Sequence, residues 1–119
     1  MLGLKSTVNL DGMKPQAVVG MMIVHSVYNF YNILCTITSC NDSKHGAGSL
    51  HPYGRAFDVR TKNIEALTGS SNATARKQDI VRICREQLGP QFDVVLEDLG
   101  GENEHMHVEW DPKTLKVTT

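Results

Sequence analysis

Two segments in which apolar and polar residues alternate constrain the fold of this chain most. AFDVR (residues 56–60) and HMHVEW (residues 105–110) each place every second side chain on the same face of an extended strand. One face of the two strands is apolar and suits a core: Phe57, Val59, Met106, Val108 and Trp110. The opposite face carries polar side chains: Asp58, Arg60, His105, His107 and Glu109. This pattern is typical of an antiparallel sheet with one covered face and one polar face.

The rest of the chain supplies helices that can cover the apolar face. Apolar residues at helical spacing predict one helix over about residues 14–29 and a clearly amphipathic one over residues 75–89. Residues 63–74 are polar and predict a loop with at most a short helical turn. The strands are expected at residues 32–38, 56–61, 92–98 and 105–110. We therefore predict a single α+β domain over residues 1–119, with about four antiparallel strands and helices packed on one face.

Composition and charge exclude several classes of protein. The 119 residues are 40% hydrophobic and 21% charged with a net charge of −1, which suits one soluble domain. Lys and Arg are scattered, so no basic surface for nucleic acid is expected. The apolar run at residues 17–30 is shorter than the ~20 residues that span a bilayer, and the N-terminus lacks the apolar core of a signal peptide. Three cysteines without CxxC spacing predict reduced thiols.

The segment SLHPYGRAFDVR (residues 49–60) adds a further candidate ligand to the polar face. Its His51 and Asp58 are seven positions apart and would lie on opposite faces of an unbroken strand. They meet only if the chain bends between them, and Pro52 and Gly54 favour such a bend. We therefore expect a turn that brings His51 to the face that carries Asp58.

Placed side by side, the polar faces of the two strands bring Asp58 close to His107, and His51 joins them from the turn. Two imidazoles and one carboxylate form a common catalytic zinc site, whose fourth position is open for water. Such a site also needs a general base, for which Glu102 and Glu104 in the preceding turn are the acidic candidates. Glu104 falls out of phase with His107 in a regular strand, so it reaches the metal only if the backbone is still turning there.

Each motif also has an ordinary structural explanation. A His-x-His pair on a strand is usually part of a solvated sheet face, and residues 49–60 can form a turn and a strand without a metal. A metal-free α+β domain is therefore one alternative. The presence of both motifs in one small chain, on compatible faces, favours a metal site.

The same two motifs resemble a known group of zinc peptidases. SLHPYGRAFD (residues 49–58) fits the pattern S-x-H-x-x-G-x-A-x-D, and EHMH (residues 104–107) is similar to the second half of that pattern. The group is the LAS-type peptidases, with lysostaphin-like enzymes, D-Ala-D-Ala carboxypeptidases and the hedgehog signalling domain. The likeness is greater to the branch of D-Ala-D-Ala carboxypeptidases and L-alanyl-D-glutamate endopeptidases, which includes small phage endolysins. It extends over roughly residues 9–112 by order of elements.

Carried over residue by residue, the resemblance implies three zinc ligands: His51, Asp58 and His107. It also implies that Glu104, three residues before the last ligand, is the general base, with Glu102 as the alternative. His105 matches a histidine that supports the site or stabilises the oxyanion. Relatives often have an arginine for the substrate in the loop that here reads SCNDSKHGAGS (residues 39–49), where Lys44 is the weak candidate.

The resemblance implies a zinc metallopeptidase that hydrolyses peptide bonds in the stem peptides of peptidoglycan. It would be a carboxypeptidase or an endopeptidase, suited to a phage endolysin or to bacterial wall remodelling. We expect a monomer, made in the cytoplasm without a signal peptide, that acts on the cell wall after release or delivery, with no nucleic-acid or membrane partner. The alternative is a non-catalytic zinc-stabilised binding module, or a virion structural module, of the same fold.

Overall fold

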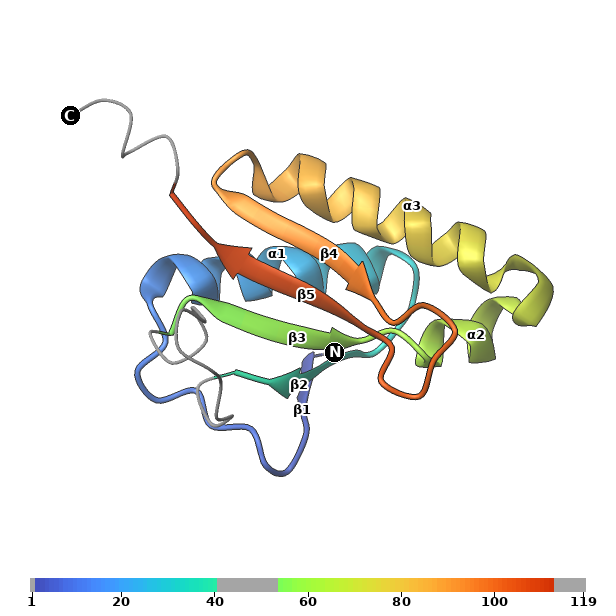
Figure 1. The fold of residues 1–119 in the computed structure, drawn as a ribbon, viewed down its shortest axis with the longest axis horizontal. Helices are drawn as coiled ribbons and strands as arrows, with labels where there is room; N and C mark the ends of the chain where they lie inside the picture. The colour runs from blue at the N-terminus through green and yellow to red at the C-terminus, as the bar shows by residue number, and fades with distance from the viewer. Residues whose placement is uncertain (1, 41–53, 113–119) are drawn as a thin grey trace.

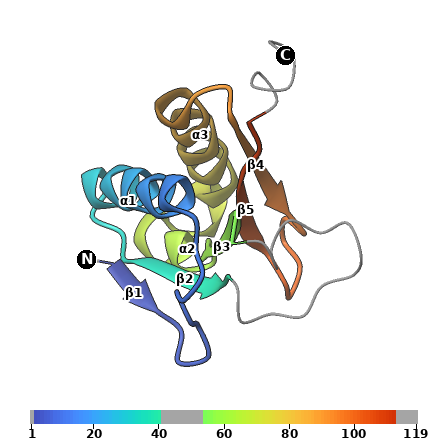
Figure 2. The ribbon, with the colours of Figure 1, turned by 90° about the vertical axis from the view of Figure 1, so that its left-hand side faces the viewer.

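The computed structural model describes residues 2–40 and 54–112. Eight elements follow one another along the chain: β1 (Leu2–Leu4), α1 (Pro15–Phe30), β2 (Cys35–Ser39), β3 (Ala56–Arg60), α2 (Asn63–Thr68), α3 (Ser70–Leu88), β4 (Phe92–Glu97) and β5 (His105–Trp110). The strands form one sheet in the order β1-β2-β3-β5-β4, and helices α1 and α3 pack on the same side of it (Figures 1 and 2). The predicted α+β class is confirmed.

The sheet differs from the predicted one in its first strand. It has five strands rather than about four, and β1 pairs with β2 in parallel, whereas the other neighbours are antiparallel. A three-residue strand is too short to show alternation in sequence, and its pairing with residues more than thirty positions away is a tertiary effect. The sheet is therefore mixed.

Helix α3 begins earlier than its amphipathic pattern predicts, and the residues before it are helical too. Gly69, with φ +77°, separates α2 from α3. Ile64 and Ala73 are buried, so this mostly polar segment contributes two apolar side chains to the core. Packing of these side chains stabilises helix where local composition predicts a loop.

The core lies between the helices and the apolar face of the sheet. Its largest fully buried apolar side chains come from α1, from the start of α2, from α3 and from the central strands: Tyr28, Phe57, Met21, Ile37, Ile64, Ile80, Met106, Val24, Val59 and Val108. Each contributes roughly 1.5–3 kcal/mol by leaving water. The two strands with alternating sequence therefore present their apolar residues to the helices, as predicted, and their polar residues to the other side.

The three cysteines are free and buried, as their number and spacing predict. Burial raises the pKa of the Cys35 and Cys84 thiols to about 12, so neither is an active nucleophile at neutral pH. Among the described residues, no helix combines the length and the apolar character that a membrane crossing requires.

Gly54 fixes the junction between the start of α1 and the start of β3. Its φ is +71°, a left-handed conformation that favours glycine, and a Cβ there would collide with the carbonyl oxygen of Gly12. The Gly54 carbonyl accepts a hydrogen bond from the Lys14 N–H at 2.8 Å. The glycine of the HPYGRAFD segment therefore has a packing role.

Gly54→Ala should destabilise the protein through both strain and collision. The left-handed backbone costs about 1–2 kcal/mol for alanine, and the contact with Gly12 adds roughly 1–3 kcal/mol. Gly100→Ala is the matched control, because Gly100 has φ +82° but no atom within 4 Å of a built Cβ. Urea unfolding should show a clearly larger loss for Gly54→Ala; equal losses would contradict the close contact.

Candidate metal centre

The polar face of the sheet is ordered by the register of its strands. Asp58 on β3 lies opposite His107 on β5, and Arg60 lies opposite His105. On the other side of β5, His105 lies opposite Glu97 of β4. Cross-strand partners share a face of the sheet, so these charged and imidazole side chains gather on the side away from the helices.

His107 is held between two carboxylates. Its Nδ1–H donates to Asp58 Oδ1 at 2.9 Å, and its Nε2–H donates to Glu109 Oε1 at 3.0 Å. All three side chains are partly buried, with exposed fractions of 16–19%. The hydrogen bond to Asp58, aided by Glu109 and opposed by burial, raises the pKa of His107 to about 9. Without a metal the ring is therefore a cation at neutral pH.

The Asp58–His107 pair fits a metal by its donor atoms. Two ligands in a tetrahedral zinc site, each about 2.0–2.2 Å from the ion, lie roughly 3.3 Å apart, which is close to the 2.9 Å between Nδ1 and Oδ1. Zinc at Nδ1 would replace the shared proton. The Nε2–H bond to Glu109 is the second contact that metal-binding histidines usually make to a carboxylate.

His105 extends the same face beside Asp58. Its Nδ1 contacts the Asn103 carbonyl oxygen at 2.7 Å, and its Nε2 lies 3.0 Å from Glu97 Oε1. The Nε2 is also 3.9 Å from Asp58 Oδ1. The backbone carbonyl can only accept, so Nδ1 carries a hydrogen and Nε2 is the nitrogen that faces the carboxylates.

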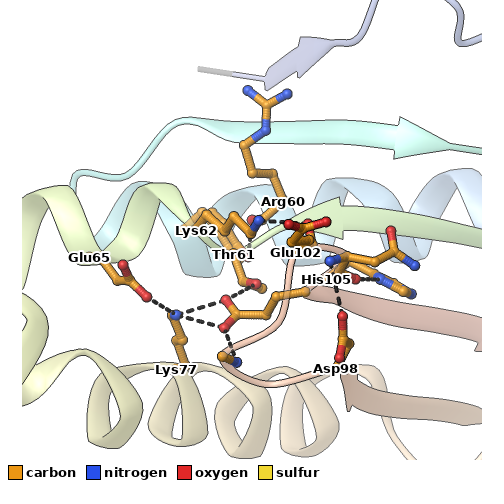
Figure 3. A network of polar contacts seen from close by, with 12 residues as sticks. Arg60, Thr61, Lys62, Glu65, Lys77, Asp98, Glu102 and His105 are labelled. Atoms are coloured by element: carbon orange, nitrogen blue, oxygen red, sulfur yellow. Dashed lines mark hydrogen bonds and ion pairs between the residues drawn. The ribbon is translucent and has the colours of Figure 1, made fainter.

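Glu104 lies just before β5 and forms an ion pair with Lys77 of α3, whose surroundings are shown in Figure 3. Lys77 Nζ lies 2.7 Å from Oε1 and 2.9 Å from Oε2, and both side chains are at most 2% exposed. The Thr61 hydroxyl donates to Oε1 at 2.6 Å, and the Gly100 N–H donates to Oε2 at 2.9 Å. Burial alone would raise the pKa of Glu104, but the bonds from Lys77, Thr61 and Gly100 lower it overall.

The four bonds bear directly on which glutamate is the base. As general base, Glu104 would have to leave Lys77, and a carboxylate with a lowered pKa is a weak proton acceptor. Its assignment stays a prediction. Glu102, the alternative, has an exposed side chain, and its backbone carbonyl accepts a hydrogen bond from Lys62 Nζ at 2.6 Å (Figure 3).

A polar cavity of about 370 Å³ opens on the face that holds Asp58 and His105. It reaches from the end of β1 to the turn before β5, and its walls are formed by ten residues: Lys5, Thr38, Ser39, Asp58, Arg60, Lys62, Glu102, Asn103, Glu104 and His105. A larger, more open hollow of about 760 Å³ lies between the end of α3 and β4 and reaches His107 and Glu109.

Two candidates from the sequence, Lys44 and His51, lie outside the described residues. The structure therefore brings together Asp58, His107 and His105 but leaves the third predicted ligand unplaced. A separate acidic group, Asp93, Glu109 and Asp111, has carboxylate oxygens within 4.8 Å of one another, but Glu109 already accepts from His107. Acidic clusters that water can reach often occur without an ion.

The sequence reasoning overlooked Lys77. It lies on the apolar stripe of α3, four residues after Ala73 and three before Ile80. A cation on a buried stripe requires a buried anion, because an unpaired charge is very costly away from water. The position of Lys77 on the apolar stripe therefore indicated that it has a buried acidic partner, but it did not indicate which acid that is.

Lys77→Met should lower the free energy of unfolding by about 3–5 kcal/mol at pH 7, because it leaves Glu104 buried without its ion pair. The second substitution Glu104→Gln in the same chain should recover part of this loss. Chemical unfolding of the two single variants and the double variant measures the coupling. Additive losses would contradict a shared interaction.

The pH dependence of stability should report the same pair. The pKa of Glu104 is below its ordinary 4.5, so its contribution is complete above pH 4.5 and is lost as the pH falls through the lowered value. The wild-type protein should therefore lose stability in acid more steeply than Glu104→Gln. Glu86→Gln, in an exposed pair with Arg82, is the control and should retain the wild-type slope.

Comparison with known proteins gives no relative for this chain. No family model matches it, and no match was found among curated proteins or solved structures. Support for a function therefore comes from the side chains and contacts of this face of the sheet.

Proposed function

We propose that the protein is a zinc-dependent peptidase that hydrolyses peptide bonds in the stem peptides of peptidoglycan. The observation that carries the proposal is the contact between Asp58 and His107, two residues 49 positions apart in sequence, with Glu109 on the second ring nitrogen. Two zinc donors and an orienting carboxylate on one polar face suit catalysis better than a solvated surface. His51, in the matching motif, is the proposed third ligand.

The two hollows that reach Asp58 and His107 suit an extended peptide. The polar cavity begins beside Asp58, and the hollow along β4 includes His107. A substrate strand that crosses the pair therefore places one segment in each. We propose that the protein acts in this way as a monomer on the cell wall, after release or delivery from the cytoplasm.

Zinc, when bound, supplies a Lewis acid and a water whose pKa is lowered to ~7. Asp58 and His107 would hold the ion, and Glu109 keeps the His107 imidazole in one orientation. The Nε2 of His105, close to Asp58, can donate to the oxygen that becomes negative during attack. A glutamate then takes the proton of the attacking water and returns it to the leaving amine.

Glu104 and Glu102 both remain candidates for that glutamate. Glu104 is at the position that the resemblance implies, but it is bound to Lys77, Thr61 and Gly100. Glu102 is exposed and lines the cavity with Asp58. If neither is a base, the engaged Glu104 favours the alternative of a zinc-stabilised binding or virion structural module without turnover.

The purified protein should contain about one zinc ion per chain by elemental analysis. Asp58→Ala and His107→Ala should lose it, because each removes one proposed donor, and Glu109→Gln should weaken zinc binding about 10–100-fold. His25→Ala, on helix α1, is the matched histidine control and should keep wild-type zinc. A wild-type chain that binds no zinc even when it is added would exclude the proposed centre.

Zinc-loaded protein should release peptides from purified peptidoglycan, and mass spectrometry of the products identifies the bond. Substitution of the true base, as Glu102→Gln or Glu104→Gln, should slow release about 10²–10⁴-fold without loss of zinc. Circular dichroism distinguishes a slower reaction from unfolding of the variant. This control is most important for the Glu104 variant, because Glu104 is buried. A zinc-loaded wild type that releases nothing would favour the binding-module alternative.

A further inference from the structure

His105 turns one ring nitrogen toward two carboxylates. Its Nδ1 lies 2.7 Å from the Asn103 carbonyl oxygen, which can only accept, so Nδ1 carries the hydrogen of a neutral ring. Nε2 is then a lone pair that faces Glu97 Oε1 at 3.0 Å and Asp58 Oδ1 at 3.9 Å. Three acceptors that face one another are stable together only with positive charge between them. Either a second ring proton or a metal ion supplies that charge.

The turn before β5 fixes the direction of this nitrogen. The Asn103 N–H donates to Asp98 Oδ2 at 3.0 Å (Figure 3), and the Asn103 carbonyl accepts from His105. A metal-binding histidine usually donates its other N–H to a carboxylate or a backbone carbonyl, which orients the ring and makes the ligating nitrogen more basic. The His105 side chain is 16% exposed. It therefore has the support that a metal ligand needs, with Nε2 as the donor atom.

The distances around Nε2 suit a metal ion. Two ligands of a tetrahedral zinc ion lie roughly 3.3 Å apart, a value between the 3.0 Å to Glu97 and the 3.9 Å to Asp58. Strand β5 lies between β3 and β4, so the two carboxylates approach His105 from either side. The polar cavity reaches Asp58 and His105, which leaves room for water at the remaining coordination positions.

Asp58 can serve this ion and the proposed zinc together. A carboxylate has two oxygens with about four lone-pair positions, and Oδ1 is also 2.9 Å from His107 Nδ1. Proteins that bind two metal ions in one site hold them about 3.5–4 Å apart. His105 and His107 are two residues apart on one face of β5, so each can hold one ion beside Asp58. The Arg60 side chain, opposite His105 on β3, extends toward β2 and β1 in Figure 3.

We propose that Glu97, His105 and Asp58 form a second binding position for a divalent transition metal, joined to the proposed zinc centre by Asp58. One imidazole and two carboxylates suit Zn²⁺ or Mn²⁺. The second ion binds more weakly than the first, because Glu97 is 50% exposed and loses side-chain freedom when it binds. The purified protein therefore keeps one zinc, and the second position fills when metal is added.

A filled second position changes the role of His105. Its Nε2 is then a ligand rather than an N–H donor, and the ion itself faces the oxygen that becomes negative during attack. This consequence rests on the proposed peptidase function. The metal position itself depends only on the contacts of Glu97, His105 and Asp58.

Calorimetric titration of the purified protein with Zn²⁺, and separately with Mn²⁺, tests the second position. The wild type should bind one further ion per chain. His105→Ala and Glu97→Gln should weaken this binding by more than the about 10–100-fold that loss of an outer carboxylate costs, and should keep the zinc present after purification. His25→Ala on α1 and Glu86→Gln, an exposed glutamate on α3, are matched controls and should bind the further ion like the wild type.

His107→Ala distinguishes the two positions, since it should lose the first zinc and still bind one ion at His105. Nitrogen NMR of the rings locates that ion: it should shift the Nε2 signal of His105 and leave the Nδ1–H in place. The inference is overturned if the wild type binds no ion beyond the first, or if His105→Ala and Glu97→Gln bind the further ion normally. A wild type whose only metal binding depends on Glu97 and His105 would support the second position and contradict the proposed zinc centre.

Discussion

The register of β3 against β5 is the constraint on which the rest of the site depends. With Asp58 opposite His107, an acid and an imidazole from distant parts of the chain share one face, and a shift of either strand by one residue would turn its member of the pair toward the core. The same register places Arg60 opposite His105. The positions of Asp58, His107, His105 and Arg60 are thus set by a single pairing, which buried Phe57 and Val108 hold in register from the other side.

The turn before β5 divides two polar systems that lie back to back. On the open face His107 and His105 contact carboxylates and are partly accessible to water. Glu104 forms a buried ion pair with Lys77 of α3, where low solvent access strengthens each hydrogen bond. Glu104, one residue before β5, therefore helps to fix the backbone that continues into His105.

Alternation in two short segments was enough to predict which side chains share a face, and Asp58 and His107 do meet. Local pattern failed where distant residues decide the outcome. Helix α2 is stabilised because Ile64 is buried in the core, and β1 is stabilised because Leu2–Leu4 pair with β2. Glu104 is two residues before Met106, so the sequence predicted that their side chains share a face of the strand. The sequence did not predict that Lys77 is its partner, because only the packing of α3 on the sheet brings Lys77 within 2.7 Å.

The bonds of Glu104 also limit how the protein can change over evolution. The segment from Gly100 to Glu104 closes on itself through the Gly100 N–H and is tied to α3 by Lys77. Surface loops usually accept insertions, but added length here would separate a buried charge from its counterion. The length of the turn between β4 and β5 is therefore set by the ion pair of Glu104 with Lys77.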